Sequence, residues 1–232
     1  MFPLKDDIPS RHFPVVNLWL IIVNILCFVY QLSLGPELEG FILSHGFVPA
    51  RFAAEQAANF MSLGSYAPIF SSMFLHGGLL HIFSNLWMLW IFGDNVEDRM
   101  GHGRYLLFYL LCGVAAAFTQ FWANPHAQAP MIGASGAISG VLGAYVFLFP
   151  RARILTFIPI FILFYLVEIP AYFFIGVWFL LQFMQGAAQQ VAVGGPVEGG
   201  VAWWAHVGGF VAGVMLLYFF KRGAKKSGQV WL

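Results

Sequence analysis

The chain consists of long apolar stretches separated by short polar segments. A membrane-spanning α-helix needs about 20 consecutive, mostly apolar residues. Stretches that meet this requirement predict spans at about residues 15–34, 79–97, 104–123, 132–150, 161–185 and 201–220. We therefore expect an all-α, polytopic membrane protein whose six helices form one bundle and one domain over residues 1–232.

The third, fourth and fifth predicted spans lie in two long apolar stretches. The 46 residues between Arg104 and Arg151 carry no formal charge, which is enough for two spans joined by a polar, proline-containing hairpin at residues 124–130. The apolar stretch of residues 154–183 is too long for one upright span and too short for two. It predicts an interfacial segment broken near Pro159, followed by a long fifth helix.

Composition narrows the class of protein. Of the residues, 60% are apolar and 9% are charged, against about 25% charged in soluble domains. This excludes a soluble globular enzyme, a disordered chain and a nucleic-acid-binding protein with a basic face. Cys27 and Cys112 lie in apolar stretches and are predicted to be buried small hydrophobic residues rather than a disulfide or a metal site. Residues 35–78 predict a loop that lies partly in the membrane interface.

The distribution of Lys and Arg predicts the orientation. Six spans place both termini on one side of the membrane, and cytoplasmic segments carry an excess of basic residues. If that side is cytoplasmic, it holds 10 of the 11 basic residues and only Arg51 lies outside. The inner ones are Lys5, Arg11, Arg99, Arg104, Arg151, Arg153, Lys221, Arg222, Lys225 and Lys226. The alternative that residues 15–34 form a signal peptide is disfavoured, because the stretch is long and no A-x-A-like site follows it.

Polar groups inside spans are energetically costly and are candidates for a functional site. Measured from the outer ends of their spans, Ser135 lies about 5 Å and His206 about 8 Å along the helix. His81 and Asn85 lie in the first two turns of the second span, so these four groups are predicted at one depth. Glu168 is roughly 22 Å from the outer end of the fifth span and does not join them.

The chemistry of the four groups fits acyl transfer. A serine hydroxyl becomes nucleophilic when a base removes its proton, and His206 is the candidate base for Ser135. Because no carboxylate is predicted near His206, the pattern favours a Ser-His dyad over a triad. His81 and Asn85 are four residues apart on one helix face, and with the backbone N–H of Ser135 they can donate hydrogen bonds to an oxyanion.

Small residues flank both members of the dyad. Gly133 and Gly136 flank Ser135, and Gly209 and Gly213 follow His206 at helical spacing. Small residues allow helices to pack closely, so the fourth and sixth spans are predicted to be neighbours. Each feature alone has a plainer interpretation as helix packing, capping or hydrogen bonding between helices. For Glu168 the alternatives are a protonated side chain beside Pro170 and a proton relay.

These residues resemble the rhomboid intramembrane serine proteases. The resemblance covers about residues 72–213 and rests on three motifs: His81-x-x-x-Asn85, Gly133-x-Ser135-Gly136 and Ala205-His206-x-x-Gly209-x-x-x-Gly213. It implies a six-helix rhomboid-like bundle with a water-filled cavity open to the outer side. It also implies that Ser135 is the nucleophile, that His206 is the base, and that His81, Asn85 and the Ser135 N–H form the oxyanion hole.

The resemblance further implies that the fifth helix and the segment from about Gly186 to Trp203 gate the lateral entry of substrates. Some family members have a tyrosine four residues after the nucleophile, where this chain has Ser139. The minimal six-helix form suggests a prokaryotic protein of the cytoplasmic membrane, with its active site open to the extracytoplasmic side. The expected partners are transmembrane protein substrates and the lipid bilayer, without a cofactor, metal or nucleic acid.

The leading hypothesis is therefore a serine endopeptidase that cleaves proteins in or beside their membrane-spanning helices. A non-catalytic scaffold that binds membrane proteins on the same fold is the alternative. A small transporter is a third hypothesis, motivated by Glu168. The sequence does not predict the oligomeric state or the identity of a substrate.

Overall fold

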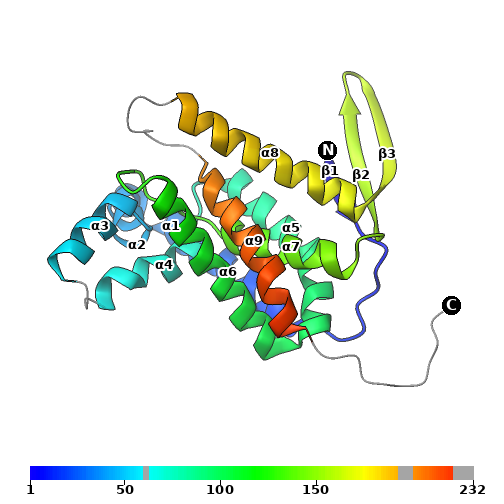
Figure 1. The fold of residues 1–232 in the computed structure, drawn as a ribbon, viewed down its shortest axis with the longest axis horizontal. Coiled ribbons are helices and arrows are strands. Elements are labelled where there is room, and N and C mark those ends of the chain that lie inside the picture. Colours follow the sequence, from blue (N-terminus) through cyan, green and yellow to red (C-terminus); the bar gives the residue numbers. More distant parts are fainter. Residues whose placement is uncertain (60–62, 193–200, 222–232) are drawn as a thin grey trace.

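Each of the six predicted spans contains a helix in the computed structural model, which describes residues 1–59, 63–192 and 201–221 (Figure 1). The helices are α1 (Val15–Ser33), α5 (Leu79–Met100), α6 (His102–Ala123), α7 (Ser135–Leu148), α8 (Ala171–Ala192) and α9 (Trp203–Phe220). Four of them, α1, α6, α8 and α9, are long and apolar enough to cross a membrane. A fifth span results if residues 63–74 and α5, which meet at a bend of 84°, form one broken span.

The fourth predicted span is shorter than expected. Helix α7 has 14 residues and begins at Ser135, whereas residues 132–134 precede the helix as a non-helical segment and a turn. Ten residues of α7 are buried among its neighbours. Non-helical backbone is tolerated at membrane depth where protein encloses it or where it lines a cavity, so a short central helix is compatible with the bundle. The prediction of six complete spans stays a prediction.

The expectation of an all-α fold is wrong between residues 153 and 170. Strands β2 (Arg153–Ile160) and β3 (Leu163–Pro170) form an antiparallel hairpin, and β1 (Phe2–Lys5) pairs with β2 to give the sheet order β1-β2-β3. The predicted fifth helix at 161–185 therefore begins ten residues later, at Ala171. The physical reason is local: the segment is rich in β-branched and aromatic residues, which favour strands.

Glu168 consequently lies outside any membrane helix. It is on β3, its carboxylate accepts a hydrogen bond from the guanidinium of Arg153 at 3.0 Å, and both side chains are exposed. Neither the protonated intramembrane carboxyl nor the proton relay fits this environment. The expectation of a titratable group deep in the fifth span is wrong, and the transporter hypothesis loses the observation that motivated it.

The segment predicted as an outer loop is largely helical. It contains α2 (Leu38–His45), α3 (Pro49–Ala58) and α4 (Ala67–Ser71), with short 3₁₀ turns between them. These helices gather at one end of the bundle, and the β2–β3 hairpin projects near the other (Figure 1). Phe47, Phe52, Ile69 and Met73 form a small buried cluster with Ala117 of α6, which fixes this region to the bundle.

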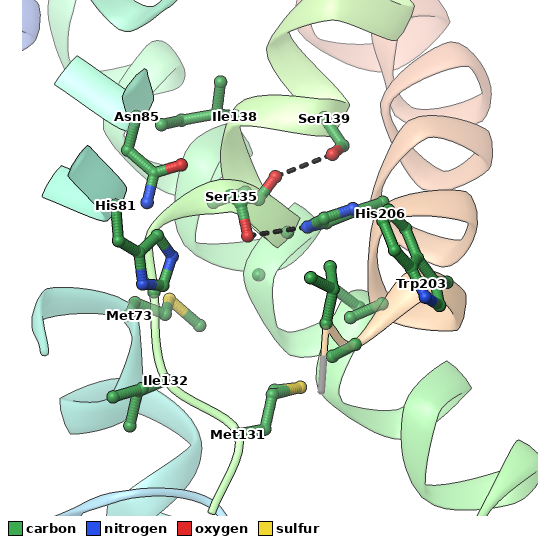
Figure 2. A pocket seen from close by; sticks show the side chains of 18 of the residues that line it. Met73, His81, Asn85, Met131, Ile132, Ser135, Ile138, Ser139, Trp203 and His206 are labelled. Atoms are coloured by element: carbon green, nitrogen blue, oxygen red, sulfur yellow. Dashed lines mark hydrogen bonds between the residues drawn. The ribbon is translucent and has the colours of Figure 1, made fainter. Parts of the chain in front are cut away.

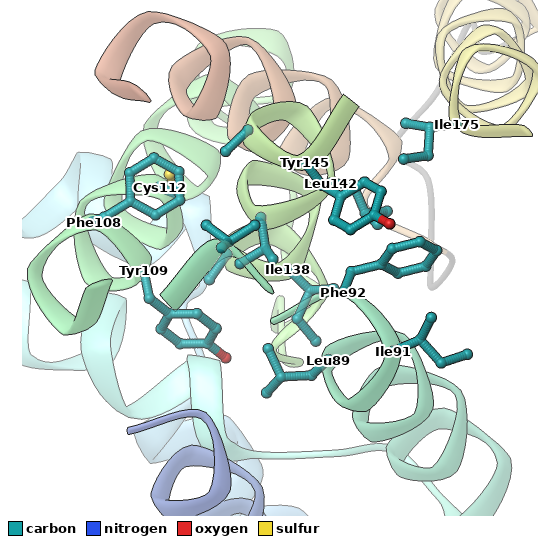
Figure 3. Packing of buried hydrophobic residues seen from close by; sticks show 14 of the residues in the cluster. Leu89, Ile91, Phe92, Phe108, Tyr109, Cys112, Ile138, Leu142, Tyr145 and Ile175 are labelled. Atoms are coloured by element: carbon teal, nitrogen blue, oxygen red, sulfur yellow. The ribbon is translucent and has the colours of Figure 1, made fainter. Parts of the chain in front are cut away.

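The main core lies between α5, α6 and α7 (Figure 3). Leu89 and Phe92 of α5 meet Tyr109 of α6 and Leu142 of α7, and all four side chains are fully buried. Cys112 lies in the same core as a free thiol, as the sequence predicts. Cys27 is also free but only half-buried. This core holds α7, and therefore Ser135 at its first residue, in the centre of the bundle.

The carboxylate of Glu97 fixes the start of α1 to the end of α5. Glu97 is buried, and its two oxygens accept hydrogen bonds from the backbone N–H groups of Val16 (3.0 Å) and Asn17 (2.7 Å). The imidazole of His102 contacts the same carboxylate. The first N–H groups of a helix have no intrahelical partner, so Glu97 supplies the cap that the local sequence of α1 lacks.

We expect Glu97→Ala to lower the free energy of unfolding by about 2 to 4 kcal/mol, because it leaves two helix-terminal N–H groups without a partner and removes the contact with the exposed His102. The matched variant is Glu39→Ala, at an exposed position in the first turn of α2, and should change stability by less than about 0.5 kcal/mol. Equilibrium unfolding in mixed micelles measures both. Equal stability of the two variants would contradict this role for Glu97.

Candidate active site

Ser135 and His206 meet where the first turns of α7 and α9 lie side by side (Figure 2). Ser135 is the first residue of α7, and His206 lies in the first turn of α9. The Nε2 atom of His206 is 2.8 Å from the Oγ atom of Ser135, which is hydrogen-bonding distance, and His206 is 9% exposed. The structure thus brings together the two residues that the sequence predicts as nucleophile and base, although they are far apart along the chain.

Close packing of α7 against α9 makes this contact possible. A Cβ atom on Gly209 would overlap the carbonyl oxygen of Gly136, and one on Gly213 would overlap the backbone of Gly140. On its other side Gly136 faces Ala116 of α6, whose Cβ would be 2.6 Å from an added Cβ. Any larger residue at these positions forces the helices apart, which would separate the serine from the imidazole.

His81 and Asn85 lie on the other side of Ser135 from His206 (Figure 2). The non-helical segment before α7 runs between them and the serine. Gly133 has φ of +125°, a conformation that favours glycine, and an added Cβ would be 2.7 Å from Nε2 of His81. The N–H of Gly133 donates to the carbonyl of Ser72 at 2.8 Å, which holds this segment against the 3₁₀ turn between α4 and α5.

The hydrogen bonds of this region show which atoms can donate to a bound group. The N–H of Gly77 donates to Nδ1 of His81 at 3.2 Å, so Nε2 of a neutral His81 carries the hydrogen. Nδ2 of Asn85 is buried and has no hydrogen-bond partner among the residues that the structure describes. The N–H of Ser135 begins a helix and lacks an intrahelical partner. His81 and Asn85 therefore offer two donors on the side of the serine away from His206, and the N–H of Ser135 is a third.

The site opens into a cavity of about 530 Å³. Its walls come from α5, α6, α7, α8 and α9 and from the segments before α5 and α7, and they are mostly apolar. Met73, Met131, Ile132 and Trp203 line it together with the polar groups (Figure 2). A cavity of this size, with few polar groups that converge on one point, is typical of a binding site for a substrate segment or a small molecule.

The amide of Gln182 on α8 contacts the second ring nitrogen of His206, and the sequence reasoning missed it. Its Oε1 atom is 2.6 Å from Nδ1 of His206, and the side chain is 9% exposed. The signal was available, since Gln182 lies in a span without another amide or ionisable side chain between residues 173 and 184. An uncharged amide inside an apolar span is costly in the same way as the other polar groups of the site.

The remaining neighbours of the imidazole are aromatic. The rings of Trp178 and Trp203 lie 6.1 Å from that of His206, measured between centroids. Ser139, one turn after Ser135, donates its hydroxyl to the carbonyl of Ser135 at 2.6 Å (Figure 2). Among the described residues no group of three or more His, Cys, Asp or Glu side chains could hold a metal ion.

The fold and the site together define a helical membrane protein with a serine–histidine pair in a cavity inside its bundle. A family model described as the Rhomboid domain matches residues 63–223. This match covers more than half of the chain and includes every residue of the candidate site. The chain belongs to the rhomboid family.

Named relatives agree with this assignment. The chain is 28% identical to Rhomboid protein 1, mitochondrial, of Saccharomyces cerevisiae over 165 residues, which are 69% of this chain and 44% of the relative. It is 38% identical to the Rhomboid protease GluP of Bacillus subtilis over 84 residues, 36% of this chain and 16% of the relative. It is 32% identical to the Presenilin-associated rhomboid-like protein, mitochondrial, of Homo sapiens over 98 residues, 41% and 26% of the two chains. The matched regions thus span less than half the length of these relatives.

Proposed function

We propose that this protein is an intramembrane serine endopeptidase that cleaves transmembrane proteins in or near their spanning helices. The observation that carries the proposal is the 2.8 Å contact between Oγ of Ser135 and Nε2 of His206, opposite the donors of His81 and Asn85. A base on one side of a serine and hydrogen-bond donors on the other are the two requirements of acyl transfer. Membership of the rhomboid family, with a relative named as a protease, supports the same reaction.

The proposed reaction has two steps. Oγ of Ser135 attacks the carbonyl carbon of the substrate while Nε2 of His206 takes the hydroxyl proton. The negative charge that forms on the carbonyl oxygen is stabilised by His81, by Asn85 and by the backbone N–H of Ser135. His206 then gives its proton to the leaving amine, and the peptide C–N bond breaks. Water attacks the acyl-enzyme by the same route, which frees the new carboxylate and restores Ser135.

The apolar walls of the cavity favour a transmembrane segment as substrate. A helical substrate holds its carbonyls in intrahelical hydrogen bonds, so it must unwind before attack. Residues with low helix propensity near the outer end of the substrate helix should favour cleavage. The segment from Gly186 to Trp203, which the resemblance implies as a gate together with α8, lies partly outside the described residues.

The proposed topology places both termini in the cytoplasm and the cavity towards the extracytoplasmic side. The basic-residue distribution supports this orientation, with 10 of 11 Lys and Arg on the inner side. The helices of residues 35–74 and the hairpin, which carries Arg153, are at different ends of the bundle (Figure 1). The cytoplasmic membrane of a prokaryote is the proposed location, and the named relatives include mitochondrial proteins and one of Bacillus subtilis.

A reporter assay tests the proposed function. The purified protein is placed in proteoliposomes with a panel of single-span reporter proteins, and mass spectrometry identifies the new ends. We expect a single cut within the reporter's spanning helix or a few residues outside it. Reporters whose outer helix end contains Gly or Ser should be cut faster than those with Leu at the same positions. Cleavage confined to soluble reporter domains, or no cleavage of any reporter, would contradict the proposal.

Asn85→Ala tests the oxyanion donors. We expect kcat to fall by roughly 10²- to 10³-fold with little change in KM, because the donor acts mainly on charge that forms in the transition state. Asn124→Ala, just after α6 and away from the cavity, is the matched control and should keep its rate within about twofold. Reporter kinetics in proteoliposomes measure both constants. A rise in KM at unchanged kcat would assign Asn85 to substrate binding instead.

A further inference from the structure

Gln182 holds the side of the imidazole that the proposed reaction does not use. His206 has one ring nitrogen towards Ser135 and the other, Nδ1, 2.6 Å from Oε1 of Gln182. Both side chains are 9% exposed, so water does not compete freely for this hydrogen bond. The three residues come from three helices, because Ser135 is on α7, Gln182 on α8 and His206 on α9.

The direction of the hydrogen bonds determines the tautomer. A neutral imidazole carries one hydrogen, and the amide oxygen of Gln182 can only accept. Nδ1 of His206 must therefore be the N–H donor, which leaves the lone pair on Nε2. That lone pair faces the hydroxyl of Ser135, and this is the form of histidine that can take the proton. The opposite tautomer would place two acceptors against each other at Nδ1 and an N–H against the serine oxygen.

We infer that Gln182 is a positioning residue, which selects the Nδ1–H tautomer of His206 and fixes the plane of its ring. The inference rests on the proposed function for its effect on rate, but its effect on the tautomer does not. In serine hydrolases with a triad an acidic residue holds the histidine in this way. Here an uncharged amide takes the same position, so the orientation is supplied without burying a carboxylate in the membrane.

The position of Gln182 on α8 has a mechanical consequence. Trp178 is four residues earlier, so it lies on the same face of α8, and its ring also approaches His206. Any outward movement of α8 withdraws the amide oxygen from Nδ1 and removes the preference for one tautomer. The competence of the base thus depends on α8 being packed against α9. A purely structural role would give Gln182 no effect on the protonation of the ring.

The kinetics of two substitutions distinguish the effect of losing the acceptor oxygen from the effect of changing the shape of the side chain. Gln182→Met keeps the length of the side chain and removes the amide oxygen, and we expect kcat to fall by about tenfold or more with KM changed less than about threefold. Gln182→Glu retains an acceptor oxygen and should recover most of the rate. Gln190→Met is the matched control, because Gln190 is on the same helix but donates to the carbonyl of Ala123. It should stay within about twofold of the unchanged protein.

Nitrogen NMR of histidine-labelled protein in detergent micelles reports the tautomer directly. The His206 signals are assigned by their loss in His206→Gln. We expect the Nδ1–H form in the unchanged protein and in Gln182→Glu, and a mixed or Nε2–H population in Gln182→Met. Thermal unfolding of each variant shows that it is folded. The tautomer is measured without substrate, so an Nδ1–H signal supports the inference even if no reporter is cleaved, which would count only against the proposed function.

Three results would overturn the inference, two of them for Gln182→Met and one for Gln182→Glu. One is a Gln182→Met protein that keeps both the rate and the Nδ1–H tautomer of the unchanged protein. The other is a Gln182→Met protein that loses activity but keeps the Nδ1–H tautomer, since that loss would come from packing alone. Failure of Gln182→Glu to restore the Nδ1–H form would also contradict it, because the carboxylate offers the same acceptor at the same distance along the side chain.

Discussion

Ser135→Ala is expected to abolish cleavage of a membrane reporter, with a fall in kcat of at least about 10³-fold. The substitution removes one oxygen atom, the only one within hydrogen-bonding distance of Nε2 of His206 among the side chains that the structure describes. The remaining donors at His81 and Asn85 can still bind a carbonyl, so affinity for the reporter should change little. Steady-state kinetics in proteoliposomes, with product detection by mass spectrometry, give both quantities.

The matched control for this loss is Ser33→Ala. Ser33 is the last residue of α1, and its hydroxyl donates to the backbone carbonyl of Tyr30, far from the cavity. It should retain its rate within about twofold. If Ser135→Ala cleaved the reporter as fast as Ser33→Ala, the nucleophile would have to be another residue, and the proposed function would lose its central observation.

His206→Gln is expected to lower kcat by a similar factor, about 10³-fold or more. Glutamine fills the space but cannot take a proton at neutral pH, so Ser135 keeps its hydroxyl proton. The double variant tests whether the two residues act together. Because nucleophile and base act as a unit, Ser135→Ala combined with His206→Gln should be no slower than either single variant.

The control for the histidine substitution is His126→Gln. His126 is exposed in the turn between α6 and α7 and should tolerate the change within about twofold. Circular dichroism and thermal unfolding in micelles show whether each variant is folded. Losses that add up in the double variant would mean that Ser135 and His206 act independently, which would contradict the dyad.

The sequence predicts a helix within each of the six spans, and it singles out four of the residues that meet at the site, but not Gln182. That success has a physical basis, because apolar stretches of membrane length and costly intramembrane polar groups leave few interpretations. Helix rise alone predicts one depth for four polar groups: His81, Asn85, Ser135 and His206. Their roles in catalysis stay predictions.

The hairpin at residues 153–170 could not be predicted from hydropathy. An apolar run has the same hydropathy whether it forms a helix or a strand, and only its β-branched and aromatic residues and its pairing with β1 favour the strand. The start of α7 at Ser135, three residues later than predicted, also depends on a tertiary contact. Residues 132–134 are apolar enough for a helix, but Gly133 must approach His81 closely, and this tertiary contact sets the helix start at Ser135.

The contact of Gln182 with His206 could not be predicted from the sequence for a different reason. Its place in an apolar stretch marks it as a candidate, but one sequence does not tell whether an amide on α8 faces the lipid or a residue on α9. Only the packing of the bundle places its oxygen on Nδ1 of His206. The difference between a predicted dyad and the observed three-residue hydrogen-bonded chain therefore comes from helix rotation, which hydropathy does not determine.

Labelling by a fluorophosphonate probe tests the central claim most directly. An activated serine attacks the phosphorus atom, fluoride leaves, and a stable adduct remains on the serine oxygen. We expect one adduct, mapped to Ser135 by mass spectrometry of the protein in proteoliposomes, and its loss in both Ser135→Ala and His206→Gln. A folded protein that takes no label at Ser135, or that labels equally well in His206→Gln, would contradict a serine activated by this histidine and would favour the non-catalytic scaffold.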